Sequence, residues 1–133
     1  QSSENLDAYS VLIIDNIGML SSLYQFAKVA YVGGAFGKGL HNILEPLGFG
    51  VPVIFGKVEK ASKFPEAAQS EQEGCGFAVV DEKGLLNQFE KLEQIDFYDK
   101  AVSSAQNWVK SNLGAAERII EKVSELRSRK YER

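Results

Sequence analysis

The chain has 133 residues, of which 44% are hydrophobic and 25% charged, and its formal net charge is −3. These values are ordinary for a soluble globular domain, and they give no reason to expect nucleic acid or an anionic membrane as the main partner. Its single cysteine, Cys75, excludes an internal disulfide and indicates a reducing compartment.

Four short apolar runs predict strands of a buried parallel sheet. They are VLII at 11–14, VAYV at 29–32, VPVIF at 51–55 and FAVV at 77–80. Each run is continuous rather than alternating, which is typical of strands covered on both faces. The segments between them are long enough for crossover helices, with helical spacing clearest at 18–28 and shorter candidates at 42–49 and 61–72.

Beyond Asp81 the chain is predicted to be helical to its end. Apolar residues recur at helical spacing in 82–94, 96–112 and 115–129, with an interruption expected at Asn112 and Gly114. We therefore predict an α/β fold: a partial Rossmann-like parallel sheet of about four strands, helices on both faces and a helical C-terminal tail. Doubly wound sheets usually have five or six strands, so the chain is either a complete small domain or the second half of a larger one.

The stretch GGAFGKGLHNILEP, residues 33–46, follows the second predicted strand and carries the strongest functional signal. Ligands of open α/β sheets bind outside the carboxyl ends of the strands, and glycines there let a ligand approach the backbone. A helix that starts at Asn42 would aim free N–H groups at the same crevice. The spacing matches neither the dinucleotide fingerprint nor the P-loop. The stretch therefore indicates an anion or nucleotide site without naming the ligand.

A purely structural explanation of the same residues remains open. Asn42 and Glu45 are three residues apart, as in a capping box, and Pro46 is tolerated in a first helical turn. His41 would then satisfy a local backbone group. From the residues alone, the capping and ligand-binding interpretations have equal standing.

Other reactive residues have ordinary structural explanations. One histidine and one distant cysteine do not predict a metal site. Cys75 has no neighbouring histidine to activate it and is expected to be a small residue that enters a strand. Asp15 is expected in a turn, and Trp108 falls on an apolar stripe and is expected in the core.

The order of several motifs resembles a known family. D-x-I-G (15–18), G-G (33–34), H-N-x-L-E-P (41–46) and G-x-P-V-I-F-G (50–56) resemble the C-terminal region of the 3-deoxy-D-manno-octulosonic acid (Kdo) transferases of Gram-negative bacteria. The likeness runs from Val11 to Val80 and more loosely through the tail. This family consists of GT-B glycosyltransferases, which have two Rossmann domains. They move Kdo from CMP-Kdo to the lipid A precursor in lipopolysaccharide biosynthesis, at the cytoplasmic face of the inner membrane.

The resemblance implies a site that binds the nucleotide-sugar donor and contains no catalytic residue, no metal and no cofactor. In it the glutamate would accept hydrogen bonds from the ribose hydroxyls of CMP. The histidine and asparagine would hold the phosphate or the sugar-acid carboxylate, the glycine pair would lie under the nucleotide, and the D-x-I-G loop would lie near cytosine. The residues so assigned are Ile17, Gly18, Gly33, Gly34, His41, Asn42 and Glu45.

The chain also departs from the family pattern. Met19 stands where the family commonly has glutamate, and Leu40 where it often has glycine. The family's N-terminal acceptor domain, with its membrane anchor and proposed catalytic base, and the first strands of the C-terminal domain have no counterpart here. Residues 1–133 are therefore expected to form the second half of the donor-binding domain, silent in catalysis when alone and prone to self-association through an exposed sheet edge.

Two alternatives complete the expectations. The chain could come from another GT-B transferase, or from a sugar-nucleotide epimerase, that uses a UDP-sugar through the same glycine and glutamate arrangement. It could also be a non-catalytic interaction module, in which Asn42 and Glu45 only cap a helix.

Overall fold

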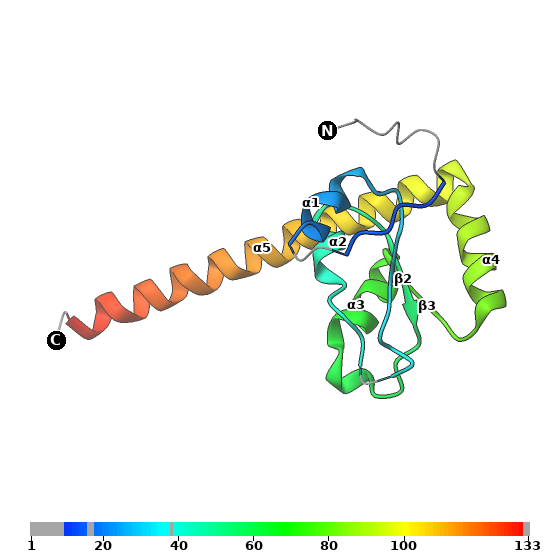
Figure 1. The fold of residues 1–133 in the computed structure, drawn as a ribbon. Helices are drawn as coiled ribbons and strands as arrows, with labels where there is room; N and C mark the ends of the chain where they lie inside the picture. Colours follow the sequence, from blue (N-terminus) through cyan, green and yellow to red (C-terminus); the bar gives the residue numbers. More distant parts are fainter. Residues whose placement is uncertain (1–9, 16–17, 38, 132–133) are drawn as a thin grey trace.

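The computed structural model describes residues 10–15, 18–37 and 39–131. At its centre is a parallel sheet whose strands are ordered as in the sequence (Figure 1). The strands are β1 (Ala30–Val32), β2 (Val53–Gly56) and β3 (Gly76–Val79). The predicted α/β class with a parallel sheet is confirmed.

In the part of the chain that the structure describes, seven helical segments surround or extend from this sheet (Figure 1). The α-helices are α1 (Leu20–Leu23), α2 (Leu44–Gly48), α3 (Pro65–Glu73), α4 (Glu82–Glu93) and α5 (Ile95–Tyr131), and the 3₁₀ helices are η2 (Tyr24–Phe26) and η3 (Ala61–Lys63). The helix predicted over 18–28 is thus two short pieces. α5 is much the longest element, and its C-terminal half projects away from the body of the molecule.

β2 is the central strand, and each of its residues is buried. In the register of the sheet, Ile54 lies between Tyr31 of β1 and Phe77 of β3. A central parallel strand is covered on both faces, which explains why its sequence is apolar without alternation.

Two hydrophobic clusters cover the two faces of the sheet. The larger cluster joins the sheet to α2, α3 and the middle of α5, and its members include Val32, Val53, Phe55, Leu47, Ala67, Ala105 and Trp108. The smaller cluster joins the opposite face to α4 and the start of α5 through Ile54, Val79, Leu92 and Ala101. Helices therefore pack on both faces, and Trp108 is a core residue, as predicted.

The prediction of a strand at 11–14 is wrong, so the described part of the chain has three strands rather than about four. Val11, Leu12 and Ile13 are 76%, 65% and 86% exposed. An apolar run becomes a buried strand only where neighbours supply ladder hydrogen bonds and cover its faces. No described segment does so for this run.

The expected interruption of the C-terminal tail is also wrong. α5 is continuous through Asn112 and Gly114. The Asn112 side chain donates a hydrogen bond from Nδ2 to the carbonyl oxygen of Trp108, 2.9 Å away and one turn earlier, which satisfies it within the helix. A single glycine costs a helix only about 1 kcal/mol, which a helix of this length tolerates.

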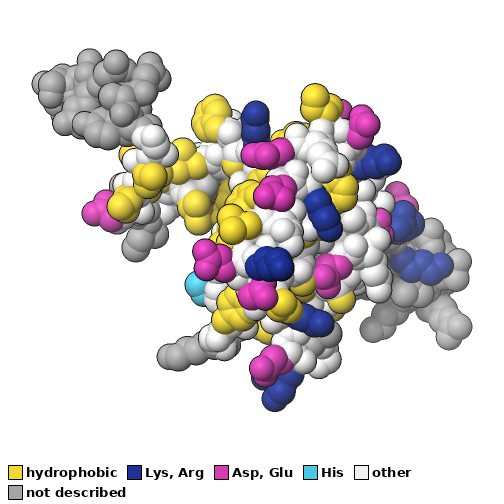
Figure 2. All heavy atoms as spheres, turned by 90° about the vertical axis from the view of Figure 1, so that its right-hand side faces the viewer, with side chains coloured by type: hydrophobic (Ala, Val, Ile, Leu, Met, Phe, Trp, Pro, Cys, Tyr) yellow, Lys and Arg dark blue, Asp and Glu magenta, His cyan; other side chains and the backbone are white. Residues whose placement is uncertain are grey.

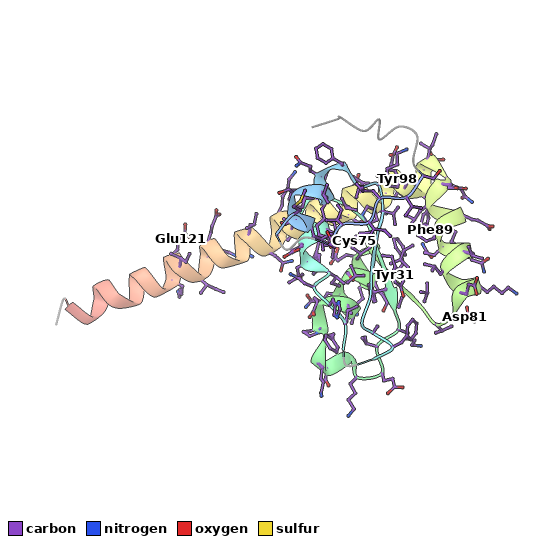
Figure 3. All side chains as sticks on the ribbon, in the orientation of Figure 1. Tyr31, Cys75, Asp81, Phe89, Tyr98 and Glu121 are labelled. Carbon is purple, nitrogen blue, oxygen red and sulfur yellow. The ribbon has the colours of Figure 1, made fainter. Side chains whose placement is uncertain are left out.

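Apolar side chains are exposed at other places as well, and α4 and the projecting part of α5 are two of them. On and beside α4 the exposed apolar residues are Val80, Leu86, Phe89 and Ile95, and Figure 2 shows hydrophobic and charged side chains interspersed on this side of the molecule. On the projecting part of α5, where Figure 3 labels Glu121, the residues Leu113, Ile119 and Ile120 are more than 60% exposed. Among the described residues, no helix combines the length and hydropathy that a membrane crossing requires.

Candidate functional site

The glycine-rich loop that follows β1 folds back on itself. The amides of Gly37 and Gly39 donate hydrogen bonds to the carbonyl oxygen of Gly34 at 3.0 and 3.2 Å. The amide of His41 donates to the carbonyl oxygen of Gly33 at 3.1 Å. Gly34 and Gly39 have φ values of 94° and 142°, which side-chain-bearing residues rarely adopt. The loop is therefore a closed turn at the carboxyl end of β1.

Within this loop, Gly33 and Gly34 differ in what surrounds them. A Cβ on Gly34 would meet the carbonyl oxygen of Gly39 and stand 2.7 Å from Cδ2 of His41. A Cβ on Gly33 would have no heavy atom within 4 Å. The chain itself therefore requires glycine at position 34, whereas the open space at position 33 leaves room for a ligand.

The predicted cap at Asn42 does not form, because the N-cap of α2 is Ile43, which makes no side-chain cap; Asn42 stands one residue earlier. Its Oδ1 accepts a hydrogen bond from the amide of Leu44 at 2.9 Å. Glu45 makes no hydrogen bond to the Asn42 backbone in the described structure, and the Asn42 side chain bonds the amide of Leu44 rather than that of Glu45, so the predicted capping box does not form. α2 is five residues long, and so short a helix adds little dipole to an anion site.

Glu45 lies in the first turn of α2 with its side chain exposed. Its charge reaches Tyr24 of η2: burial first, and then the carboxylate of Glu45, raise the pKa of the Tyr24 phenol above its ordinary value. No hydrogen bond or ion pair to a described residue engages the Glu45 carboxylate, which leaves it able to accept hydrogen bonds from a ligand.

Most of the predicted site residues form one surface at the carboxyl end of β1. Gly33, Gly34, His41, Asn42 and Glu45 follow one another along the closed turn and α2, and the three polar side chains are exposed. The two remaining predicted site residues, Ile17 and Gly18, come from the earlier D-x-I-G loop. Gly18 has a φ of 95° and no described atom within 4 Å of where its Cβ would stand, and Ile17 lies outside the described residues.

A cavity that the sequence interpretation missed lies beside this surface. Its volume is about 350 Å³, and the loop after β1 and the segment after β2 form it together, where they lie side by side at the bottom of Figure 1. We call it the lysine pocket; its lining residues include Phe36, Gly37, Lys57, Lys60, Lys63 and Phe64. One sequence signal was available, since the lysines recur at every third residue directly after a predicted strand.

Among the described residues, no cluster of side chains could hold a metal ion. Cys75 is not an activated nucleophile either. Cys75 is fully buried inside the body of the molecule, where Figure 3 labels it. Burial, and secondarily the charge of Glu73, raise the pKa of its thiol to about 11. The thiol therefore stays protonated at neutral pH, as expected for a structural cysteine.

Comparison with known proteins gives consistent matches, although no family model matches the chain. It is 40% identical over 94 residues to the 3-deoxy-D-manno-octulosonic acid transferase of Aquifex aeolicus, over 67% of this chain and 25% of that protein. It is 38% identical over 92 residues to the transferase of the same name from Chlamydia muridarum, over 67% of this chain and 21% of that protein. The chain thus spans about a quarter of the length of these relatives.

A solved structure matches the fold. The C-terminal CMP-Kdo-binding domain of WaaA from Acinetobacter baumannii superimposes with a TM-score of 0.60 at 24% identity, over 71% of this chain and 50% of that one. The chain belongs to the 3-deoxy-D-manno-octulosonic acid transferase family and has the fold of its C-terminal domain.

Proposed function

We propose that this chain is the part of a Kdo transferase that binds the nucleotide of the CMP-Kdo donor. The observation that carries the proposal is the 40% identity over 94 residues with the Aquifex aeolicus transferase. The solved relative with the same fold is, by its name, a CMP-Kdo-binding domain. A glutamate without a described partner and an open glycine at the carboxyl end of β1 supply the kind of surface that a nucleotide needs.

In this proposal Glu45 accepts hydrogen bonds from the ribose hydroxyls, and Gly33 leaves room for the nucleotide to approach the backbone. His41 and Asn42 hold the phosphate or the sugar-acid carboxylate. Gly34 contributes through the shape of the turn, since its own Cβ space is filled by the chain. Ile17 and Gly18, in the loop that carries the D-x-I-G motif, lie near the cytosine base in this proposal.

The reaction would be glycosyl transfer with CMP as the leaving group. The residues of this chain would stabilise the negative charge that develops on the departing phosphate, and a base outside the 133 residues would deprotonate the acceptor hydroxyl. We expect the whole protein to transfer Kdo to a lipid A precursor at the cytoplasmic face of the bacterial inner membrane. The isolated chain is expected to be inactive.

We further propose that residues 1–133 are the second half of the donor-binding domain. The chain covers half of the solved relative, and Val11, Leu12 and Ile13 expose their side chains beside a three-stranded sheet. The other half of the domain would pair with the outer edge of β1 and cover this run. Without it, the same edge could pair with a second copy of the chain, which sedimentation at several concentrations would detect.

The proposed function is tested by NMR titration of the ¹⁵N-labelled chain with CMP, and with UMP as the competing nucleotide. We expect amide shifts at Gly33, Asn42 and Glu45 that are stronger with CMP. Glu45→Ala should abolish them, whereas Glu90→Ala, an exposed glutamate on α4, should leave them unchanged.

Three results would contradict the proposal. Equal or stronger shifts with UMP would favour a UDP-sugar enzyme. No shifts in a folded chain would favour the interaction module, for which the Asn42 hydrogen bond to Leu44 is the supporting observation. Kdo transfer by the isolated chain would overturn the assignment of the catalytic base to a missing part.

A further inference from the structure

The lysine pocket is formed by two segments that follow neighbouring parallel strands. The loop that follows β1 contributes Ala35, Phe36, Gly37 and Gly39, and the segment that follows β2 contributes residues 57–60, 63 and 64. The carboxyl ends of adjacent parallel strands meet at one edge of a sheet, which is where open α/β folds bind ligands. The pocket therefore occupies a position suited to binding, beside the surface that contains Gly33 and His41.

The charge of this pocket is opposite to that of the chain as a whole. Lys57, Lys60 and Lys63 all line it, and Glu59 is the one acidic residue in the lining. The whole chain carries a net charge of −3. Among the residues that the structure describes, no carboxylate forms an ion pair with any of these lysines. Three ammonium groups around one cavity repel one another, and a bound anion would relieve that repulsion.

The shape of the pocket suits a small ligand with an apolar face as well as a charge. The aromatic rings of Phe36 and Phe64 form part of its walls, and each packs on a glycine: Phe36 on Gly56 and Phe64 on Gly39. Its volume of about 350 Å³ lies at the lower end of the range of roughly 300–1,000 Å³ that small-molecule sites occupy. It has room for a sugar-sized group and is small for an entire nucleotide sugar.

We propose that the lysine pocket binds an anionic, sugar-sized group whose carboxylate or phosphate is held by Lys57, Lys60 and Lys63. Lysine ammonium groups bind both anions as point charges. The ring atoms of the sugar pack against Phe36 and Phe64. None of the lining residues belongs to the set assigned to the nucleotide, so the pocket stands as a separate site whether or not CMP binds.

The test uses the ¹⁵N-labelled chain and four probes: Kdo, the neutral methyl ester of Kdo, glucose 1-phosphate and inorganic phosphate. We expect the amides of Gly37, Gly39 and Lys57 to shift with at least one sugar anion. The methyl ester should shift them at least tenfold more weakly. A stronger response to Kdo assigns the site to a carboxylate, and a stronger response to glucose 1-phosphate assigns it to a phosphate.

A matched pair of variants separates the pocket from general surface charge. Lys57→Gln/Lys60→Gln/Lys63→Gln should weaken the apparent affinity at least tenfold. Lys83→Gln/Lys91→Gln/Lys100→Gln removes the same charge from exposed positions on α4 and α5 and should leave the affinity within twofold. Both variants change exposed side chains, and a native-like amide spectrum verifies their folds.

Several outcomes would overturn the inference. These are equal binding of the methyl ester, equal weakening by the two triple variants, binding of inorganic phosphate as tight as that of both sugar anions, or no shift with any probe. The CMP titration reports on Gly33, Asn42 and Glu45 instead. A failed nucleotide site and a failed lysine pocket therefore give different patterns of shifts.

Discussion

The imidazole of His41 lies where a side chain on Gly34 would have to stand, with its Cδ2 2.7 Å from the position of a Cβ on that glycine. Because Gly34 also has a φ of 94°, Gly34→Ala combines backbone strain with a steric clash. We expect a loss of about 2–4 kcal/mol in the free energy of unfolding, measured by urea denaturation.

Gly33→Ala is the matched control for this prediction, since its Cβ would meet no atom within 4 Å and its φ is not positive. It should change stability by less than about 1 kcal/mol. Equal losses in the two variants would show that the turn does not close as described. If the nucleotide approaches the backbone here, Gly33→Ala should also weaken CMP binding while the fold is retained.

The hydrogen bond that Asn42 accepts from the first residue of α2 gives a second prediction. Asn42→Ala removes the acceptor of the Leu44 amide and should lower the free energy of unfolding by about 1 kcal/mol. Asn42→Asp keeps a side-chain acceptor and should lose much less stability. Thermal unfolding followed by circular dichroism measures both. If Asn42 only bonds the Leu44 amide, the CMP shifts of a folded Asn42→Ala chain will equal those of the wild type; a role in donor binding requires that they weaken.

Burial of Cys75 predicts its reactivity. The thiol is fully buried and its pKa is raised to about 11, so an aromatic disulfide reagent at pH 8 should react with it only as fast as the chain opens. Adding urea to the unfolding midpoint should accelerate the reaction by orders of magnitude. Rapid modification of the native chain would mean that Cys75, directly before β3, is accessible to solvent.

The same thiol makes stability depend on pH in the alkaline range. Its ordinary pKa is 9.0 and its folded pKa is about 11, so the unfolded chain loses this proton first. The contribution of Cys75 is therefore complete below pH 9 and is lost as the pH rises toward 11. Urea unfolding at pH 8, 9 and 10 should show a steeper decline for the wild type than for Cys75→Ala; parallel declines would contradict the burial of the thiol.

The sequence correctly predicted the three strands that helices of the same chain cover. β1 lies inside one of the predicted apolar runs, β2 and β3 each overlap one except at a terminal glycine, and helices of this same chain cover all three. The run at 11–14 has the same composition and stays exposed, since hydrophobic content does not say whether a partner is present. The continuity of α5 was missed because a glycine was given more weight as a helix breaker than it has in a long helix.

The candidate site was only partly predictable for a related reason. Gly33, His41 and Glu45 are close in sequence, so a local pattern located them. The lysine pocket joins residues about twenty positions apart, Phe36 and Lys57 among them, and only the parallel pairing of β1 with β2 brings these together. The need for glycine at position 34 likewise depends on a contact with His41 that no spacing rule contains.

The contact between Phe36 and Gly56 gives the last prediction. A Cβ on Gly56 would stand 2.5 Å from Cε2 of Phe36, a residue that is 64% exposed and whose ring can therefore move outward. Gly56→Ala should therefore cost less than about 1 kcal/mol of stability. It should still weaken binding of a sugar anion severalfold, because Phe36 lines the lysine pocket.

A double-mutant cycle with Phe36→Ala tests this mechanism. Once the ring is absent, adding Gly56→Ala should change neither stability nor binding further, since Phe36 supplies the three nearest atoms that the new methyl group would meet. Additive losses of affinity in the double variant would mean that Gly56 acts on the pocket through the backbone of β2. The ring of Phe36 would then not form the wall against which the ligand packs.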